Sequence, residues 1–411
     1  MLDRSVVALG AAAMPRSASG QTSSNRVALY ASVGPELTQY DVDVDGAALV
    51  ERDAVTLPAN VHYAWPHASG RYLYVASSNS ASGMGPAGDK HHVTAFRIDP
   101  VSGALAPHGD PIALPTRPIH MTSDIPSEHL LVAFSNPSAL RVYRINSDAT
   151  PGAEVAQPEP IGTGIYAHQV RVRLDNRLVI LVTRGHDAAP GKPEDPGALK
   201  VFDYRNGRLT KEVSVAPNGG YGFGPRHLDF HPTMPWVYVS LERQNKLDLF
   251  EFAGDTLSPA PVYRKDILAE PGNTRWRQAA GTVHVHPNGR FVYAVNRAST
   301  TTEFEGRRVF AGGENTFAVY SIDPATGEPS LIQHVDTRGI HCRTFHIDPS
   351  GRLLVAAHIM PLLAKDGATL RTVPASLAVF RIDGDGKLDF VRKYDVDVGD
   401  RTMFWMGMVA R

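Results

Sequence analysis

Two sets of polar positions recur along the chain in a pattern that could build one polar site. The first set stands at the start of an apolar segment and comprises His62, His120, His168, Arg226 with His227, His284, and Arg343 beside His341. The second set stands at the end of the next apolar segment and comprises Ser78, Asn136, Arg184, Glu242, Arg297 and Ile359. If the two segments are neighbouring antiparallel strands, both sets lie at one end of the strand pairs. Cations held close together repel one another unless an anion compensates, so the pattern indicates a site for an anionic ligand.

A repeat of about 55 residues supplies the elements that must position these side chains. Its most regular part is rich in β-branched, aliphatic and aromatic residues, which is typical of a buried strand. This strand is expected at residues 71–76, 129–134, 177–182, 235–240, 290–295 and 352–357. Turn sequences containing Pro, Asn and Gly precede most of these segments. A third, alternating strand is expected at residues 93–98, 140–145, 199–204, 247–252, 317–322 and 377–382, and a further turn leads to a fourth.

Four antiparallel strands per repeat are typical of one blade of a β-propeller. The count gives six complete blades and a seventh that is split between residues 27–42 and residues 402–409. Pairing the N-terminal and C-terminal strands would close the ring and leave no open sheet edge. We therefore predict an all-β fold, a seven-bladed β-propeller over residues 26–411. A pair of β-sandwiches, the alternative, would not explain the same three strands six times.

The composition limits the partners of the chain. It has 411 residues with 41 Lys and Arg against 42 Asp and Glu, a formal net charge of −1. No basic field is available to attract nucleic acid, so none is expected as a partner. No apolar run approaches the ~18 residues of a membrane span, so no membrane partner is expected either. A single cysteine, Cys342, leaves the fold without an internal disulfide.

Residues 1–25 differ in kind from the rest of the chain. Arg4 is followed by an apolar stretch over residues 6–14 and by small and polar residues. This order resembles a short secretory signal, although Asp3 is unfavourable there. A disordered extension or a misassigned start are the alternatives, so a periplasmic or secreted location and a cytoplasmic one both stay open.

Three motifs resemble those of one known family. They are Ala167-His-Gln-Val170, Gly224-Pro-Arg-His-Leu-Asp-Phe-His-Pro232, and Asn273-Thr-Arg-Trp276 followed by the segment 283–297. Together they are similar to the seven-bladed lactonases, which include the propeller-type 6-phosphogluconolactonases and the fungal 3-carboxymuconate lactonizing enzymes. The resemblance implies a lactone hydrolase that acts on a small anionic or sugar-derived lactone, without a metal or another cofactor.

The resemblance also implies which residues form the site. The expected catalytic residues are His168, Glu242, Arg226 and Arg297. The expected substrate-binding residues are His227, Arg275, His284, Arg343, Arg184, His120 and His62. The chain also has longer segments between Arg184 and Leu199 and over residues 300–313, which should overhang the same mouth. The substrate of the family therefore does not transfer directly.

Opening a lactone requires an activated water and donors for the charge that develops on the carbonyl oxygen. In our hypothesis Glu242 or His168 acts as the general base, while the forked guanidinium groups of Arg226 and Arg297 bind the anion. The same residues could serve a lactonizing cycloisomerase. There a substrate carboxylate would add across a double bond, and an acid such as His168 would protonate the neighbouring carbon.

The sequence allows three other interpretations. His284 and His286 share one face of a strand, but zinc needs three or four convergent ligands. Cys342 lies between His341 and Arg343, which could activate its thiol, yet a free cysteine is commonly a buried hydrophobic residue. A non-enzymatic propeller that binds a partner at its rim should carry aromatic anchors. Few aromatic residues qualify at the expected rim, namely Tyr166, Tyr221 and Trp276.

Overall fold

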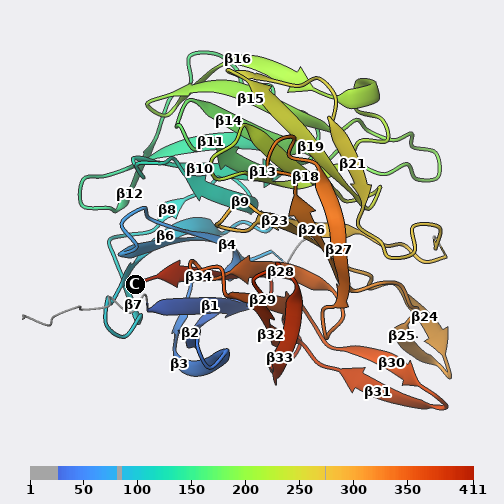
Figure 1. Ribbon diagram of the computed structural model, residues 1–411. Helices are drawn as coiled ribbons and strands as arrows, with labels where there is room; N and C mark the ends of the chain where they lie inside the picture. Colours follow the sequence, from blue (N-terminus) through green and yellow to red (C-terminus); the bar gives the residue numbers. More distant parts are fainter. Residues whose placement is uncertain (1–25, 81–85, 274) are drawn as a thin grey trace, which may run out of the picture.

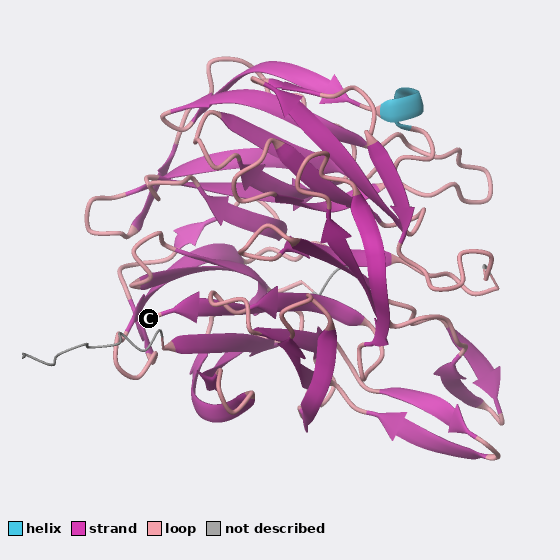
Figure 2. Ribbon diagram, in the orientation of Figure 1, coloured by secondary structure: helices cyan, strands magenta, loops and turns pink. Residues whose placement is uncertain are grey.

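The computed structural model describes residues 26–80, 86–273 and 275–411. Their regular structure is almost entirely β-strand (Figures 1 and 2). The helix among them is one 3₁₀ turn, Pro217–Gly220. No described helix is long and apolar enough to cross a membrane. The signal-like segment over residues 1–25 lies outside the described residues.

The first four blades follow one another along the chain, each written here from its innermost strand outward. Blade 1 contains β4 (Asn60–Pro66), β5 (Tyr72–Ser78), β6 (His91–Ile98) and β7 (Leu105–Pro107), with β8 (Ile112–Ala113) also on β6. Blade 2 contains β9 (Pro118–Ser123), β10 (His129–Ser135), β11 (Ser138–Ile145) and β12 (Pro151–Glu154). Blade 3 contains β13 (Ala167–Val172), β14 (Leu178–Thr183), β15 (Ala198–Arg205) and β16 (Arg208–Val215). Blade 4 contains β17 (Pro225–Phe230), β18 (Trp236–Leu241) and β19 (Lys246–Ala253), which pairs with both β20 (Thr256–Leu257) and β21 (Tyr263–Asp266).

The remaining blades include two insertions and the split sheet. Blade 5 contains β22 (Ala280–Val285), β23 (Phe291–Asn296), β26 (Thr316–Ile322) and β27 (Pro329–Asp336), with the hairpin β24 (Thr301–Phe304) and β25 (Arg307–Phe310) inserted. Blade 6 contains β28 (Cys342–Ile347), β29 (Leu353–His358), β32 (Ser376–Ile382) and β33 (Leu388–Asp395), with the hairpin β30 (Leu362–Asp366) and β31 (Thr369–Val373) inserted. Blade 7 contains β34 (Met406–Ala410), β1 (Val27–Val33), β2 (Glu36–Asp43) and β3 (Ala48–Thr56).

The predicted closure of the ring is confirmed. Strand β34 pairs antiparallel with β1, so that Val27 lies opposite Ala410 and Ala31 lies opposite Met406. Figure 1 shows the two ends of the chain side by side, β1 in blue and β34 in red. The closing strand begins at Met406 rather than at Thr402, and blade 7 gains a third N-terminal strand, β3, that the sequence analysis did not predict.

The apolar cores lie between neighbouring blades rather than in one central core. In β14, Leu178 and Ile180 pack toward blade 4, while Val179 and Leu181 pack toward blade 2. Successive side chains of a strand point to opposite faces, so a strand covered on both faces needs apolar residues throughout. This is why the second strand of each repeat has a nearly continuous apolar sequence.

Removal of the closing strand should prevent cooperative folding. Met406, Met408 and Val409 are almost fully buried in the interfaces of blade 7 with its two neighbours. Each contributes about 1.5–3 kcal/mol, and the sum is comparable to the whole 5–15 kcal/mol that stabilises a typical domain. We expect a chain that ends at Trp405 to lose its sharp thermal transition in circular dichroism. A peptide of residues 402–411 added in excess should restore it, and a native-like transition without the peptide would contradict this role of β34.

A candidate active site at the mouth of the propeller

A β-bulge interrupts the innermost strand of six blades near the end where these strands begin, which we call the mouth. At each bulge the register of the strand pair skips one residue, or two in blade 5. The skipped residues are His62, Ile119, His168, Arg226, Gly281 with Thr282, and Arg343. A bulge turns a side chain out of the regular alternation of the strand. Ile119, His168, Arg226 and Arg343 accordingly line one cavity of about 740 Å³ at the mouth.

The second strand of four blades contributes to this cavity the residue that directly follows the end of the strand. These residues are Arg184 in blade 3, Glu242 in blade 4, Arg297 in blade 5 and Ile359 in blade 6, and all four line the same cavity. The predicted convergence is therefore observed for these four positions, whereas Ser78 and Asn136 do not line the cavity. Gly281 makes room for one of them, because a Cβ atom there would lie 3.3 Å from Cδ of Arg297 and 2.6 Å from Cγ1 of Val295.

Glu242 is the centre of the charged cluster in this cavity. Its carboxylate forms ion pairs with the guanidinium groups of Arg184 and Arg297, and Nε of Arg226 lies 3.4 Å away. Burial would raise the pKa of Glu242, but Arg297, Arg184 and Arg226 outweigh it and hold this pKa well below its usual range. The carboxylate is therefore ionised, and it is a weak base because three cations stabilise its charge.

Arg226 is the largest fully buried side chain, with 1 % of its surface exposed. Its Nε and Nη1 atoms have no hydrogen-bond partner, and neither has Nε of Arg297. Burial and Arg297 lower the pKa of Arg226, whereas Glu242 raises it. An arginine stays protonated in a protein, and leaving buried charged donors unpaired is costly. The cavity therefore presents N–H groups that an anionic ligand would satisfy.

Two further side chains complete the inner wall. The guanidinium group of Arg343 lies 3.5 Å from the centre of the Phe404 ring, and its Nε donates to the Phe404 carbonyl oxygen at 3.1 Å. Burial lowers the pKa of Arg343 to about 9. His341 lies 3.1 Å from Nη1 of Arg297 through its Nε2 atom. Because a guanidinium can only donate, Nε2 of His341 accepts this bond and its imidazole is neutral.

His168 is a buried neutral base at the edge of this cluster. It is 7 % exposed, and its Nδ1 atom has no hydrogen-bond partner. Burial, followed by the nearby charge of Arg226, lowers the pKa of His168 well below its ordinary value. Its ring packs against those of Tyr166 and His227, with centroids 6.4 Å and 5.2 Å away. A neutral imidazole fixed in this way can accept a proton at neutral pH.

Five of the predicted binding residues do not line the mouth cavity. His62, His120 and His227 are buried around it, where His62 packs against Phe404 and His120 packs against Tyr63 and His227. In blade 2 the bulge places Ile119 toward the cavity in place of His120, because the register shifts one residue earlier than the aligned sequences indicate.

His284 and Arg275 are the other two predicted binding residues that do not line the mouth cavity. In blade 5 the bulge falls at Gly281 and Thr282, which precede His284 by three and two residues. His284 therefore lines a separate cavity, where its Nδ1 atom lies 3.4 Å from Oδ2 of Asp229. Arg275 is exposed beside the ring of Trp276. In the structure these two residues therefore do not line the cavity of Arg226, and their role in substrate binding stays a prediction.

Several cavity residues were absent from the predicted set. They are Tyr166, Asp187, Arg277, Thr300, Thr301, Arg308, His341, Met360, Leu362, Thr402 and Phe404. Tyr166 and His341 were placed near the mouth by the sequence without a role in the site, and in the structure each stands two residues before a bulge residue. Both have a positive φ, 59° and 58°, which is uncommon for residues with a side chain.

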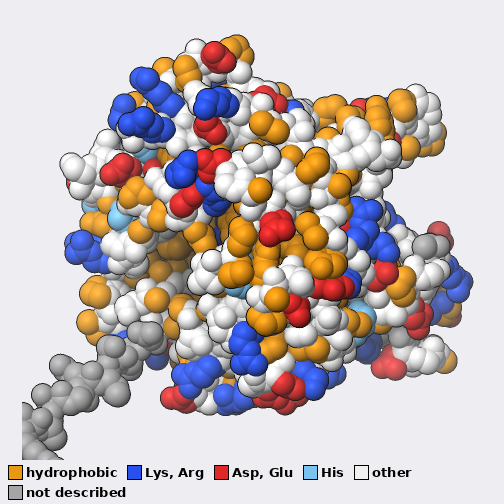
Figure 3. Space-filling view, turned by 45° about the horizontal axis from the view of Figure 1, so that its top comes forward, with side chains coloured by type: hydrophobic (Ala, Val, Ile, Leu, Met, Phe, Trp, Pro, Cys, Tyr) orange, Lys and Arg blue, Asp and Glu red, His pale blue; other side chains and the backbone are white. Residues whose placement is uncertain are grey.

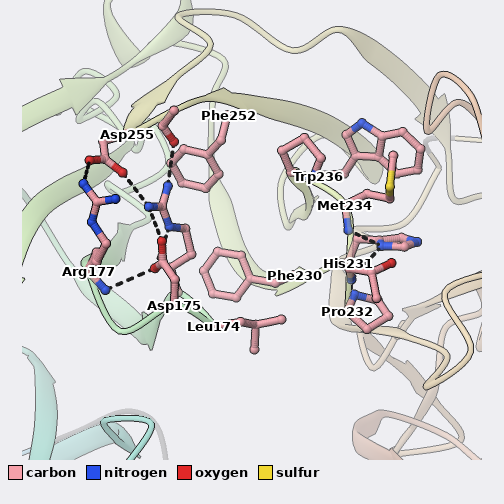
Figure 4. A pocket seen from close by; sticks show the side chains of 14 residues that line it. Leu174, Asp175, Arg177, Phe230, His231, Pro232, Met234, Trp236, Phe252 and Asp255 are labelled. Atoms are coloured by element: carbon pink, nitrogen blue, oxygen red, sulfur yellow. Dashed lines mark hydrogen bonds and ion pairs between the residues drawn. The ribbon is translucent and has the colours of Figure 1, made fainter.

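Positive charge exceeds negative charge among the residues that line the mouth cavity. Six arginines line the cavity against two carboxylates, Asp187 and Glu242. On the face drawn in Figure 3, basic and acidic side chains are instead interspersed. A cavity of about 470 Å³ at the opposite end, between blades 3 and 4, shows the same balance (Figure 4). There two arginines are balanced by two carboxylates, because Arg173 pairs with Asp175 and Asp255 and Arg177 also pairs with Asp255.

Two other groups of the described residues could be considered for chemistry, a possible metal site and the free cysteine. Asp124, Glu128 and His129 are close enough to hold a metal ion. The Asp124 carboxylate, however, already accepts hydrogen bonds from the Tyr204 hydroxyl and from the backbone of both other residues. This group therefore stabilises the turn between β9 and β10. Cys342 is buried, and burial raises the pKa of its thiol to about 12, so it is not an activated nucleophile.

A family model described as a lactonase with a seven-bladed β-propeller matches residues 26–359. The chain belongs to this lactonase family. The assignment agrees with the seven blades and with the predicted class of enzyme, a lactone hydrolase.

Relatives within the lactonase family share moderate identity over most of their length. A 6-phosphogluconolactonase of Bacillus subtilis is 25 % identical over 345 residues, which are 81 % of this chain and 87 % of the relative. A 6-phosphogluconolactonase of Serratia proteamaculans is 26 % identical over 371 residues, covering 89 % and 94 %. The solved periplasmic gluconolactonase of Pseudomonas aeruginosa superposes with a TM-score of 0.69 at 20 % identity, over 94 % of this chain and 99 % of that one. This last likeness shows the common fold.

Proposed function

We propose that this lactonase hydrolyses a sugar-derived lactone that carries an acidic group, as the names of its 6-phosphogluconolactonase relatives suggest. The observation that carries the proposal is the set of buried N–H groups that have no hydrogen-bond partner, namely Nε and Nη1 of Arg226 and Nε of Arg297. Both arginines and Glu242 line one cavity that is large enough for a small molecule. Such donors, fixed before charge develops, are what an oxyanion requires.

In the proposed mechanism the arginines bind and His168 moves the proton. His168 accepts a proton from water as the water oxygen attacks the carbonyl carbon of the lactone. The negative charge that develops on the carbonyl oxygen is stabilised by the N–H groups of Arg226 and Arg297. The tetrahedral intermediate then collapses, the bond to the ring oxygen breaks, and His168 returns the proton to that oxygen. The product is the open hydroxy acid.

Glu242 has a positioning role in this scheme. The sequence analysis left Glu242 and His168 open as the general base. The pKa of both groups is lowered, but the carboxylate of Glu242 is engaged by Arg297, Arg184 and Arg226, whereas Nδ1 of His168 has no partner and the nearby charge of Glu242 favours protonation of His168. Glu242 instead holds Arg184, Arg226 and Arg297 close together against their mutual repulsion.

The proposal predicts the behaviour of an Arg297→Ala variant. We expect its kcat/KM for 6-phosphogluconolactone to fall about 10²-fold, the typical cost of one lost oxyanion donor. An Arg171→Ala variant is the matched control, because Arg171 also pairs with a buried carboxylate, Asp229, but lines the other cavity. Rates can be followed by the acid released at constant pH. Equal losses in both variants would contradict the assignment, and muconate cyclisation without lactone hydrolysis would favour the cycloisomerase.

A further inference from the structure

Two inserted hairpins form an arm beside the mouth. The first, β24 and β25, leaves blade 5, and the second, β30 and β31, leaves blade 6. Both extend together at the lower right of Figure 1. Their apolar side chains share one small cluster that includes Phe310, Leu362 and Val373, and Nζ of Lys365 lies 3.8 Å from the centre of the Phe304 ring. The arm is therefore a packed unit and not a pair of independent loops.

The arm supplies one wall of the mouth cavity. Thr300, Thr301 and Arg308 come from the first hairpin and its approach, and Met360 and Leu362 come from the second. Hydroxyl and guanidinium groups thus face the cavity beside two apolar side chains. This arrangement offers donors for an anion and, next to them, a surface that excludes water.

Arg308 is the arginine of this wall that is not neutralised. Its Nε and Nη2 atoms donate to Oγ1 of Thr301 at 3.1 Å and 2.8 Å. Among the residues that the structure describes, no carboxylate lies within ion-pair distance of it. Arg277, across the cavity rim, is paired instead with Asp187 at 2.7 Å. The positive charge of Arg308 is therefore uncompensated, and a second acidic group of a ligand could pair with it.

We propose that Arg308, with Thr300 and Thr301, forms a subsite for the distal acidic group of the lactone, a phosphate or a carboxylate. This inference rests on the proposed function, in which the reacting carbonyl lies at Arg226 and Arg297. The inner cluster and the arm then bind the two ends of one substrate. The arm would thus make the enzyme selective for lactones that bear an acid opposite the ester.

The neighbouring arginine provides a matched control. Arg307 and Arg308 are consecutive, both are exposed, and both belong to β25. Successive residues of a strand point to opposite faces, and of the two, Arg308 lines the cavity. Alanine at either position removes the same charge from the same hairpin. A difference between the two variants therefore reports on the cavity and not on net charge or on folding of the arm.

The test compares three lactones with each variant. For Arg308→Ala we expect kcat/KM to fall about tenfold or more for 6-phosphogluconolactone, mainly through KM, because one charge-assisted contact is lost. Unsubstituted gluconolactone should be unaffected. A glucarolactone, which carries a carboxylate at the same end, shows whether the subsite accepts both acids or phosphate alone. Arg307→Ala should resemble the wild type with all three.

Two outcomes would overturn the subsite. One is an Arg308→Ala variant that treats phosphorylated and unsubstituted lactones alike, and the other is an equal effect of Arg307→Ala. Titration calorimetry with 6-phosphogluconate and gluconate separates this inference from the proposed function. If the protein hydrolyses no lactone but Arg308→Ala still weakens the binding of 6-phosphogluconate and not that of gluconate, the proposed reaction is wrong and the proposed subsite is supported.

Discussion

A Glu242→Gln variant should lose kcat/KM by about 10³-fold or more and lose about 3–5 kcal/mol of its free energy of unfolding. The substitution keeps the shape of the side chain but removes the charge that Arg184, Arg226 and Arg297 share. The three guanidinium groups would then repel one another and move apart, so that the donors for the oxyanion are no longer aligned. Steady-state rates with 6-phosphogluconolactone and unfolding in urea measure the two losses.

A second buried carboxylate separates the catalytic effect from the structural one. Asp229 pairs with Arg171 at 3.0 Å, and although burial raises its pKa, Arg171 and His284 bring it to about 2. Asp229 lines a different cavity, to which Glu242 and its arginine partners do not belong. An Asp229→Asn variant should therefore lose comparable stability while its folded fraction retains near-normal kcat/KM. If Glu242→Gln also retained normal kcat/KM in its folded fraction, Glu242 would have only a structural role.

A His168→Gln variant should lose kcat by about 10²–10⁴-fold, the usual contribution of a general base, with little change in KM. Since its pKa is lowered, His168 is neutral through pH 6 to 8 and becomes protonated only at lower pH. The wild-type kcat should therefore be flat through neutral pH and fall on the acidic side, and the variant should lack this acidic limb.

A histidine in the other cavity is the control for His168. His346 is also surrounded by protein, and burial lowers its pKa to about 4, but it lies beside His284 in the cavity away from the mouth. A His346→Gln variant should keep both the rate and the pH profile. An acidic limb that persisted in His168→Gln would assign the proton transfer to another group, with neutral His341 as the nearest candidate on the cavity wall.

Most of the fold could be predicted from the sequence because the repeat is strong. The continuous apolar second strands reflect burial on both faces, and their ends mark the mouth without further information. Arg184, Glu242 and Arg297 were found in this way, since each directly follows such a strand. Strands β3 and β30 were not predicted, because their outward-facing polar residues leave little periodic signal.

The innermost strands were harder to interpret, and the reason is the bulges. A bulge moves by one or more residues without changing the apolar pattern around it, so alignment of the repeats selected His120 and His284 where the backbone presents Ile119 and Gly281. The segment over residues 300–313 was expected at the mouth, but Arg308 was not singled out within it. Its place in the cavity depends on how two insertions from different blades pack together, which no local pattern encodes.

The bulge positions also have a meaning for how such a ring could acquire new chemistry. A residue at a bulge takes no part in the ladder of backbone hydrogen bonds, so exchanging its side chain leaves strand pairing intact. Four such places already line one chamber, and at Ile119 the bulge holds a residue without any reactive group. Laboratory evolution for a different substrate would find a tolerant starting point at Ile119, with the scaffold unaltered and the arginines of the cavity still in place.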